Sequence, residues 1–305
     1  TSGGCHASPV PGVSMGMAED PFTEHRPLLF TLAYELLGSA EDAEDVLQES
    51  YLRWSAADRA TVEYPRAYLV RLVTRQCLNH LRSARARREE YVGSWLTEPI
   101  RTAPEVADDV ILSEAVSMGL MLVLETLGPL ERAVFVLHDV FGYTHAEIAA
   151  STGRTEVTVR QTAHRARRHV QARRRRFAPD SDAARAVVDR FLRAAATGDV
   201  QALMDLLAPD VVLIADGGGK AAAVRRPLTG PEDVARFAVG ASRTSPATTV
   251  ALAAYNGMPA ARFLVGGRLD WLLAFELADG RITGLYGMRN PDKLRHADAR
   301  RTLGR

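Results

Sequence analysis

A stretch of the chain near residue 160 carries side chains suited to binding nucleic acid. Residues 160–176 contain eight arginines and no carboxylate. Five polar side chains lie on or beside one face of a helical pattern: Arg160, Gln161, His164, Arg165 and Arg168. Guanidinium, amide and imidazole groups hydrogen-bond base edges or neutralise phosphates. The pattern therefore favours a DNA-reading helix over the alternative, a surface hairpin whose arginines are only solvated.

A second candidate for chemistry is the aspartate that opens the string DGGGK. Asp216 follows a β-rich run, and in an enclosed pocket its carboxyl could abstract a proton next to a carbonyl. No second acid or histidine is recognisable beside it, since His296 is the histidine of that region. The favoured alternative is a carboxylate that is hydrogen-bonded to its own glycine loop or paired with Lys220 or Lys293. We therefore predict no catalytic residue, no metal site and no cofactor.

A helix-turn-helix must position the arginine-rich stretch. Gly153 can supply the positive φ of a tight turn between two helices, and Thr155 is the expected N-cap of the second. Four apolar residues then recur at helical spacing and predict one buried stripe: Val159, Ala163, Ala166 and Val170. The opposite face of this second helix would point to the solvent or to DNA.

Further helices are predicted upstream of this motif. The first ends at Gly38, and Ser39 caps the second. The third carries an inward stripe of Val70, Val73, Cys77 and Leu81. Residues 91–109 contain two prolines and a glycine without a sustained period, which is typical of a linker. A single helix is expected from Val110 to about Thr126.

Beyond residue 181 the pattern changes to helices followed by β-rich runs. Asn256-Gly257 and Asp279-Gly280 are dipeptides that tight hairpins prefer. Helices followed by a meander predict an α+β cone with an interior pocket, behind two all-α domains. The predicted segments are a disordered or expression-derived lead-in at 1–16, an all-α domain at 17–90, a linker at 91–109, a helix-turn-helix domain at 110–177, an α+β domain at 181–294 and a polar tail at 295–305.

Composition restricts the class of protein. The 305 residues are 47% hydrophobic and carry a net charge of +1, with two cysteines, Cys5 and Cys77. At most one disulfide can form, which favours a reducing cytoplasm. No apolar run approaches the roughly 18–20 residues that span a bilayer, so we expect no membrane partner.

Three blocks of sequence carry a family resemblance. Residues 39–54 (SAEDAEDVLQESYLRW) and 64–88 resemble the sigma-2 domain of extracytoplasmic-function (ECF) sigma factors, and residues 127–170 resemble the sigma-4 domain. The resemblance implies a dissociable subunit of bacterial RNA polymerase. Its partners would be promoter DNA and the clamp helices and flap of the polymerase core. An ordinary one-component transcription factor, whose ligand domain drives a helix-turn-helix, is the competing interpretation.

The same resemblance implies three sets of contacts. The −35 element would be contacted by Thr158, Arg160, Gln161, His164, Arg165 and Arg168. The −10 element would be contacted by Tyr64, Arg71, Arg75, Arg82, Arg85, Arg87 and Arg88. The core polymerase would be contacted by Glu44, Asp45, Gln48, Glu49 and Arg53. Each set has a simpler alternative in solvated or packed side chains.

The C-terminal part resembles the SnoaL-like, NTF2-type fold, and three short strings are similar to those of SigJ-like ECF sigma factors. They are WLTEP, DGGGK and NPDKL, and they imply a regulatory interface between domains formed by Trp95, Leu96, Glu98, Pro99, Asp216, Gly217, Gly218, Gly219, Lys220, Asn290, Pro291, Asp292, Lys293 and Leu294. The resemblance thus implies regulation in cis. A small ligand in the cone, or an enzyme with a DNA-binding appendage, stays open as an alternative.

Overall fold

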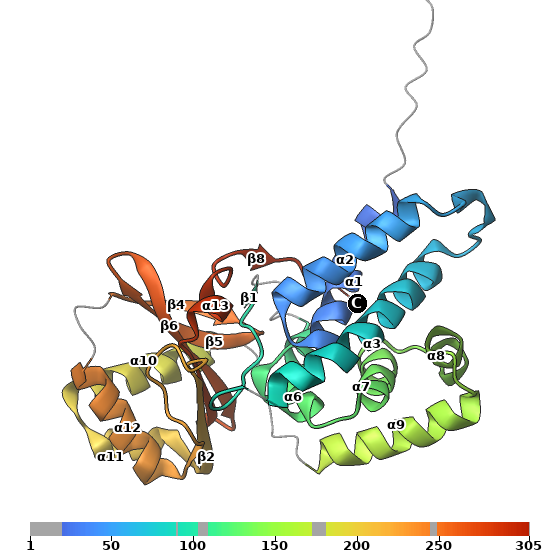
Figure 1. Cartoon of the computed structure of the whole chain (residues 1–305). Helices are drawn as coiled ribbons and strands as arrows, with labels where there is room; N and C mark the ends of the chain where they lie inside the picture. Colours follow the sequence, from blue (N-terminus) through green and yellow to red (C-terminus); the bar gives the residue numbers. More distant parts are fainter. Residues whose placement is uncertain (1–19, 90, 103–108, 173–180, 245–248, 305) are drawn as a thin grey trace, which may run out of the picture.

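A computed structural model describes residues 20–89, 91–102, 109–172, 181–244 and 249–304, without the side chains of residues 82–89 and 110. A helical half and a sheet-containing half lie side by side, and the linker passes between them (Figure 1). The predicted lead-in at 1–16 lies outside the described residues.

The N-terminal helices pack around one apolar core. They are α1 (Pro21–Leu37), α2 (Ala40–Ser55), the 3₁₀ turn η1 (Arg59–Thr61) and α3 (Pro65–Glu89). Gly38 ends α1 with φ 72°, and the Ser39 side chain caps α2 by accepting from the Asp42 amide. The predicted inward stripe of α3 is confirmed as buried, since none of its members is more than 6% exposed: Val70, Val73, Cys77 and Leu81.

The second group of helices shares that core. It comprises α5 (Val110–Ala115), α6 (Met118–Glu125), α7 (Pro129–Phe135), the π-helical η2 (Val136–Val140), α8 (His145–Thr152) and α9 (Glu156–Gln171). The prediction of one helix from Val110 to Thr126 is wrong, because Ser117 interrupts it. The Ser117 hydroxyl accepts a hydrogen bond from the Leu120 amide and so caps a new helix. One cluster of buried residues runs through both helical groups.

The C-terminal half is a curved mixed sheet with helices on its inner face. These helices are α10 (Asp182–Thr197), α11 (Val200–Leu206) and α12 (Pro231–Thr244), whereas the short α13 (Pro291–Leu294) packs with the linker on the outer side. The strands are β2 (Leu207–Asp216), β3 (Leu228–Thr229), β4 (Thr249–Tyr255), β5 (Met258–Val265), β6 (Arg268–Ala278) and β7 (Arg281–Met288). The strand order is β3-β2-β7-β6-β5-β4-β1-β8, with β2 parallel to β7.

The two faces of this sheet belong to different cores. Side chains alternate between faces along a strand, so Phe275 joins the inner core beneath α10–α12. Its neighbour Ala274 joins the outer core, where Leu96 of the linker and Met118 of α6 also lie. The outer face is therefore the surface that contacts the helical half.

Two short strands, β1 (Arg101–Thr102) and β8 (Arg300–Arg301), extend the sheet beyond β4. The sequence pattern predicts that these segments belong to a linker and to a polar tail. The free edge of β4 explains the difference, since its unpaired backbone groups accept β1 as a neighbour. Beyond β8 the chain reaches α1, where the Gly304 amide donates to the Thr31 hydroxyl at 3.0 Å.

Candidate functional site

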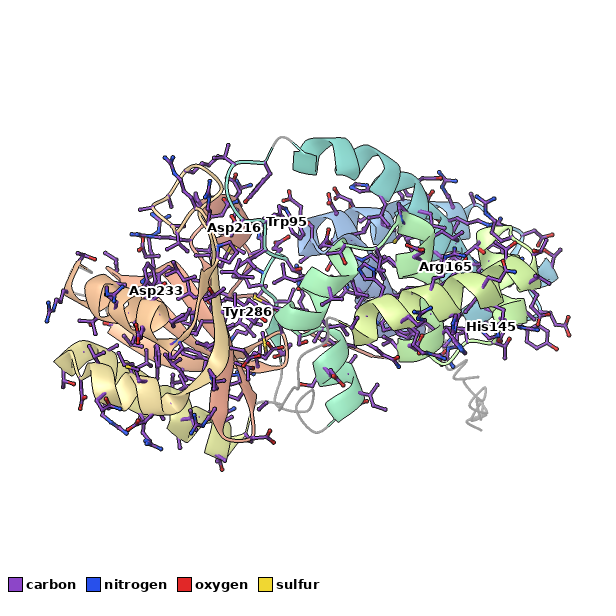
Figure 2. The ribbon with its side chains drawn as sticks, turned by 90° about the horizontal axis from the view of Figure 1, so that it is seen from below. Trp95, His145, Arg165, Asp216, Asp233 and Tyr286 are labelled. Carbon is purple, nitrogen blue, oxygen red and sulfur yellow. The ribbon has the colours of Figure 1, made fainter. Side chains whose placement is uncertain are left out.

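The helix-turn-helix exposes one polar face of α9. Gly153 ends α8 with φ 65°, and the Thr155 side chain caps α9 by accepting from the Thr158 amide. The predicted apolar stripe is confirmed as buried, with no member more than 3% exposed: Val159, Ala163, Ala166 and Val170. All six side chains expected at the −35 element are exposed: Thr158, Arg160, Gln161, His164, Arg165 and Arg168. Figure 2 shows Arg165 on this helix, well away from Trp95 and Asp216.

The arginines of α9 form ion pairs that could be exchanged for other anions. Arg160 pairs with Glu156 at 2.7 Å, and Arg165 pairs with Glu131 at 3.4 Å. Both guanidinium groups are exposed, and such surface pairs contribute only about 0–1 kcal/mol. A phosphate could therefore replace either carboxylate at small cost in free energy.

The face of α3 expected at the −10 element is partly covered by α8. Tyr64 is 68% exposed and Arg71 is exposed. Arg75 instead donates from Nε to the Ser151 carbonyl at 3.2 Å and from Nη2 to the Ala150 carbonyl at 3.4 Å. These carbonyls lie in the last turn of α8, where acceptors lack intrahelical donors. The side chains of Arg82, Arg85, Arg87 and Arg88 lie outside the described part of the chain.

The polar face of α2 is mostly open. Four of the five residues expected to contact polymerase are exposed: Asp45, Gln48, Glu49 and Arg53. Glu44 is less exposed because its carboxylate pairs with Arg26 of α1 at 2.5 Å and with Arg301 of β8 at 2.6 Å. Leu52, 68% exposed, and Tyr51 add an apolar edge to this face. A mixed acidic and apolar surface of this kind suits a protein partner.

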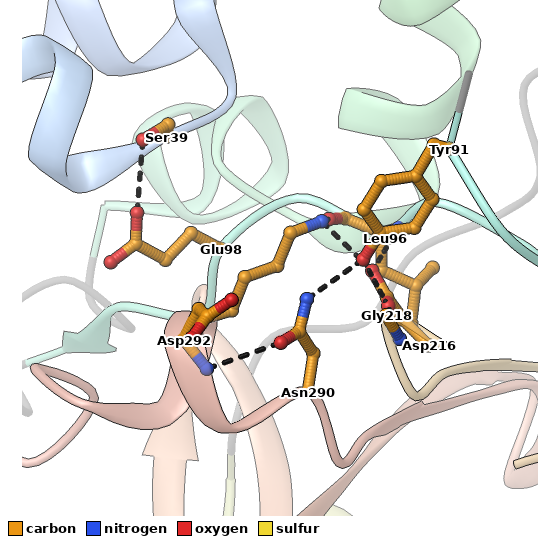
Figure 3. A network of polar contacts seen from close by, with 9 residues as sticks. Ser39, Tyr91, Leu96, Glu98, Asp216, Gly218, Asn290 and Asp292 are labelled. Carbon is orange, nitrogen blue, oxygen red and sulfur yellow. Dashed lines mark hydrogen bonds and ion pairs between the residues drawn. The ribbon is translucent and has the colours of Figure 1, made fainter. Parts of the chain in front are cut away.

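Asp216 forms the centre of a polar contact between the cone and the linker, here called the Asp216 clamp (Figure 3). Its side chain is fully buried. Oδ1 accepts from the Tyr91 hydroxyl at 2.5 Å and from the Gly218 amide at 2.9 Å. Oδ2 accepts from the Leu96 amide at 2.9 Å and from Lys293 Nζ at 2.8 Å. Four groups from three segments therefore hold one carboxylate.

The neighbours of Asp216 strengthen this clamp. Lys293 Nζ also donates to the Leu96 carbonyl at 2.5 Å and lies 4.0 Å from the centre of the Trp95 ring. Asn290 Nδ2 donates to the Tyr91 hydroxyl at 2.8 Å. Burial, with the Asp216 carboxylate beside it, raises the pKa of Tyr91 well above its usual value, so the phenol stays a donor. The strings at 95–99, 216–220 and 290–294 thus meet at one place.

Gly218 explains why this loop approaches the NPDKL string so closely. It has φ 61°, and a Cβ atom there would lie 2.4 Å from Asn290 Nδ2. A Cβ at Gly217 would lie 2.2 Å from the Ala221 carbonyl oxygen. Glycine is required at both positions for steric reasons. Five other expected residues of this interface lie in or beside the same contact: Gly219, Lys220, Pro291, Asp292 and Leu294. Pro99 is buried further along the linker.

Glu98 connects the linker to the start of α2 (Figure 3). Its Oε2 accepts from the Ser39 hydroxyl at 3.0 Å and from the Ala40 amide at 2.8 Å. The Tyr34 hydroxyl donates to the Glu98 carbonyl at 2.7 Å. A carboxylate at a helix N-terminus is stabilised by the orphan amides and the helix dipole. Burial nevertheless raises the pKa of Glu98.

Asn256 forms a second contact that sequence analysis missed, here called the Asn256 clamp. The residue is fully buried at the β4–β5 turn. Its Oδ1 accepts from the Ile100 amide at 3.1 Å, while Nδ2 donates to the Tyr34 hydroxyl at 2.6 Å and the Val116 carbonyl at 2.8 Å. One amide therefore joins the linker, α1 and the α5–α6 junction. The sequence signal, Asn-Gly, indicated only a hairpin.

The helix α6 lies close to the sheet at a third contact between the two halves, here called the seam. A Cβ atom at Gly119 would lie 2.2 Å from Glu276 Oε1 and 3.0 Å from the Tyr286 hydroxyl. Glu276 is 2% exposed and accepts from the Tyr286 hydroxyl at 2.9 Å. Figure 2 shows Tyr286 between the two halves. The absence of a side chain at Gly119 lets the helix lie against this buried pair.

The enzyme alternative gains no support from this arrangement. Both carboxylate oxygens of Asp216 accept hydrogen bonds from the linker, so the side chain is occupied by the interface. Among the described residues, no group of three acidic, histidine or cysteine side chains could hold a metal ion. In the same part of the chain, no helix is both long enough and apolar enough to cross a bilayer.

Comparison with known proteins identifies the family. The chain is 38% identical to the ECF RNA polymerase sigma factor SigJ of Mycobacterium tuberculosis, over 91% of this chain and 93% of that protein. The chain belongs to the ECF RNA polymerase sigma factors. A second relative, the probable ECF sigma factor SigI of the same organism, is 32% identical over 88% of this chain and 92% of its own length.

The domains of this ECF sigma factor follow the predicted order. The family model for sigma-70 region 2 matches residues 22–87, which span α1 to α3. The model for sigma-70 region 4 matches residues 117–170, which span α6 to α9. The crystal structure of SigJ superimposes with a TM-score of 0.74 and 34% identity, over 91% of this chain and 98% of that chain. The predicted fold class, two all-α domains followed by an α+β SnoaL-like cone, is confirmed.

Proposed function

We propose that this sigma factor reads a promoter through α9 and α3 while its own cone holds both helices in a closed arrangement. The exposed face of α9 enters the major groove of the −35 element. Its glutamine and arginines hydrogen-bond base edges and phosphates there. The proposal is supported by the exposure of all six expected side chains above a buried apolar stripe.

The −10 element is assigned to α3 and the segment before it. The exposed ring of Tyr64 gives an unpaired base a surface on which to stack. Arg71 and Arg75 neutralise phosphates, which makes binding depend on salt. The same role is proposed for the arginines at the end of α3, Arg82, Arg85, Arg87 and Arg88.

The polar face of α2 docks on the clamp helices of the core polymerase, and the sigma-4 domain contacts the flap. This assignment is supported by the exposed side chains of Asp45, Gln48, Glu49 and Arg53, beside the apolar Leu52. Glu44 joins this surface once its pairs with Arg26 and Arg301 open. The protein would act in the cytoplasm, by binding rather than by catalysis.

The contact of Arg75 with α8 is the observation that carries the closed state. Arg75, expected at the −10 element, is exposed but donates from Nε and Nη2 to carbonyls of the helix-turn-helix, so a phosphate of the −10 element would have to compete with α8 for this side chain. One core also runs through both helical groups. The −10 and −35 elements are separate stretches of duplex, so the two domains must part before both are read.

Regulation in cis follows from where the cone holds the chain. The Asp216 clamp and the Asn256 clamp both bind the linker between the two DNA-reading domains. Holding the linker fixes the spacing of these domains. Release of the linker would let each domain reach its own promoter element.

The test is transcription by the full chain with core polymerase on a library of genomic fragments. Initiation at a shared sequence motif is expected, with a loss of about tenfold or more in Arg168→Ala, because a lost base contact costs about 1–3 kcal/mol. Arg190→Ala, on the exposed face of α10, serves as the matched control and should leave the transcript yield unchanged. No holoenzyme, or initiation without sequence preference, would overturn promoter recognition.

The proposed regulation in cis is tested with a separate variant. Asp216→Asn should change transcript yield while the recovered −35 sequence stays the same, because the clamp lies far from α9 (Figure 2). A changed −35 preference would argue that the cone takes part in reading DNA. Unchanged yield together with an opened linker would argue that the closed state has no regulatory effect.

A further inference from the structure

The inner side of the cone contains a cavity of about 510 Å³ between α10, α12 and the sheet. Aromatic rings from both helices and two strands contribute to its wall: Phe191, Phe237, Phe263 and Trp271. Phe263 and Trp271 stack with ring centres 3.6 Å apart and planes within 9°, which makes one wall flat. Small-molecule sites are typically apolar hollows of about 300–1,000 Å³. The size and lining of this cavity fit a molecule that contains rings.

A smaller chamber of about 120 Å³ adjoins the first. The two chambers share five lining residues: Leu213, Phe237, Ala241, Trp271 and Leu273. The smaller one also contains Arg289, whose guanidinium pairs with Asp270 at 3.0 Å. Both members of this pair are partly exposed, so another anion can compete for Arg289. Asp270 lines the same chamber, so the continuous space is apolar over most of its length and carries an Arg289–Asp270 ion pair at one end.

The smaller chamber lies on the opposite face of the strands that form the Asp216 clamp. Side chains alternate along a strand, so Ala215 lines the chamber while Asp216 faces the linker. The same holds where β7 ends, since the Arg289 side chain lines the chamber while Asn290 binds Tyr91. The Arg289 amide also donates to the Asp216 carbonyl at 2.8 Å. This backbone hydrogen bond connects Arg289 directly to the residue at the centre of the clamp.

We propose that the cone binds a largely apolar, ring-containing small molecule with one acidic group, and that its occupancy is coupled to the Asp216 clamp. The rings occupy the larger chamber, and the acidic group pairs with Arg289 in place of Asp270. The proposed binding of this small molecule does not depend on whether the protein recognises a promoter. The consequence for transcription rests on the regulation in cis proposed above.

Two dyes test the site on the full chain. The probe 8-anilinonaphthalene-1-sulfonate has two ring systems and one acid, and N-phenyl-1-naphthylamine is its neutral counterpart. Saturable binding of both is expected. Ala241→Trp fills the shared wall and should weaken both at least tenfold, whereas Ala186→Trp, on the exposed side of α10, should not. Arg289→Gln should weaken the sulfonate about fivefold and the neutral dye less than twofold.

Several outcomes would contradict the proposed binding site. If the dyes bind another apolar surface, Ala241→Trp should leave their affinity unchanged. Binding that does not saturate would also indicate that the dyes do not occupy this cavity. If Ala241→Trp lacks the near-ultraviolet dichroism of the folded chain, Ala238→Phe fills the larger chamber in its place. If Arg289→Gln lowers the affinity of both dyes equally, the proposed pairing of the ligand's acidic group with Arg289 is wrong.

The coupling is tested by reciprocity, because two linked sites change each other's affinity by the same factor. Asp216→Asn should change the affinity of the sulfonate dye at least threefold. Asp205→Asn makes the same substitution on the exposed face of α11, outside both chambers and both clamps, and is the matched control, with no change expected. Equal affinity in Asp216→Asn and the parent would overturn the coupling. These measurements use neither polymerase nor DNA, so their failure is distinct from a failure of promoter recognition.

Discussion

The Asp216 clamp and the Asn256 clamp hold the same linker with different chemistry. Asp216 is charged, and its carboxylate accepts from Lys293, Tyr91 and two amides at the edge of the cone. Asn256 is neutral and fully buried, and its amide joins the linker to α1 and to the α5–α6 junction. The charged clamp can respond to a neighbouring ion or ligand, whereas the neutral clamp fixes the relative position of three segments.

The largest effect is expected at the neutral clamp. Asn256→Gly keeps a residue that accepts φ 52° but leaves the Ile100 amide and the Val116 carbonyl without their partner. Each unsatisfied buried group costs about 1–3 kcal/mol, so we expect a loss of about 3 kcal/mol in the free energy of opening the domains. The first transition in urea unfolding measures it.

Asp279→Gly is the matched control for this variant. Asp279 occupies the corresponding hairpin position with φ 51° and is exposed. It should change the free energy of the same urea transition by no more than about 0.5 kcal/mol. Equal shifts in both variants would mean that only turn geometry matters at residue 256.

A smaller loss is expected at the charged clamp. Asp216→Asn keeps the shape and one acceptor oxygen, but its NH₂ group faces two of the four donors and the partner charge of Lys293 is lost. Lys293 retains the Leu96 carbonyl and the Trp95 ring, so we expect a loss of about 1–2 kcal/mol. A loss larger than that of Asn256→Gly in the same urea experiment would reverse the ranking of the two clamps.

The largest pH dependence should come from Glu35, which lies between the helical domains. Burial raises the pKa of Glu35 to about 8, and the nearby Arg132 opposes this only in part. The folded chain then holds a proton that the unfolded chain releases above about pH 4.5. Stability is therefore fully present below pH 4.5 and falls as the pH rises towards 8, with a limiting slope of about 1.4 kcal/mol per pH unit.

Glu35→Gln should flatten that profile, as measured by urea midpoints from pH 5 to pH 8. The slope should persist in Asn256→Gly, because the amide does not titrate. A flat profile in the parent chain, or an unchanged slope in Glu35→Gln, would assign the pH dependence elsewhere.

The smallest effect is expected at the exposed rim of the charged clamp. Lys220 pairs with Asp292 at 2.5 Å, and both side chains are about half exposed. Exposed pairs contribute about 0–1 kcal/mol, so Lys220→Met should cost less than about 0.5 kcal/mol in the urea experiment. A loss matching that of Asp216→Asn would show that the rim, rather than the buried carboxylate, holds the loop.

The difference between the clamps also explains what the sequence could predict. The face of α9 was predictable because its cap and apolar stripe lie within one helix, where spacing alone determines burial. Asp216 and Asn290 were found because they stand in strings that resemble those of relatives. Asn256 was missed, because its partners lie as far as 222 residues away and its local pattern indicates only a turn.

Two segments of the fold were missed for a related reason. Ser117 lies in an apolar run that suits one long helix, and only the cap that it forms divides α5 from α6. Arg300 and Arg301 look like part of a solvated polar tail, yet they form β8 beside β1. Pairing with a distant strand edge leaves no periodic signal in two residues.

Gly119 suggests how the closed form could be opened without touching any side chain that binds DNA or the linker. Its missing side chain is the space in which Glu276 and Tyr286 lie against α6. One added methyl group would act as a wedge between the two halves of the molecule. The glycine at this position thus permits the close contact between the cone and the helical half.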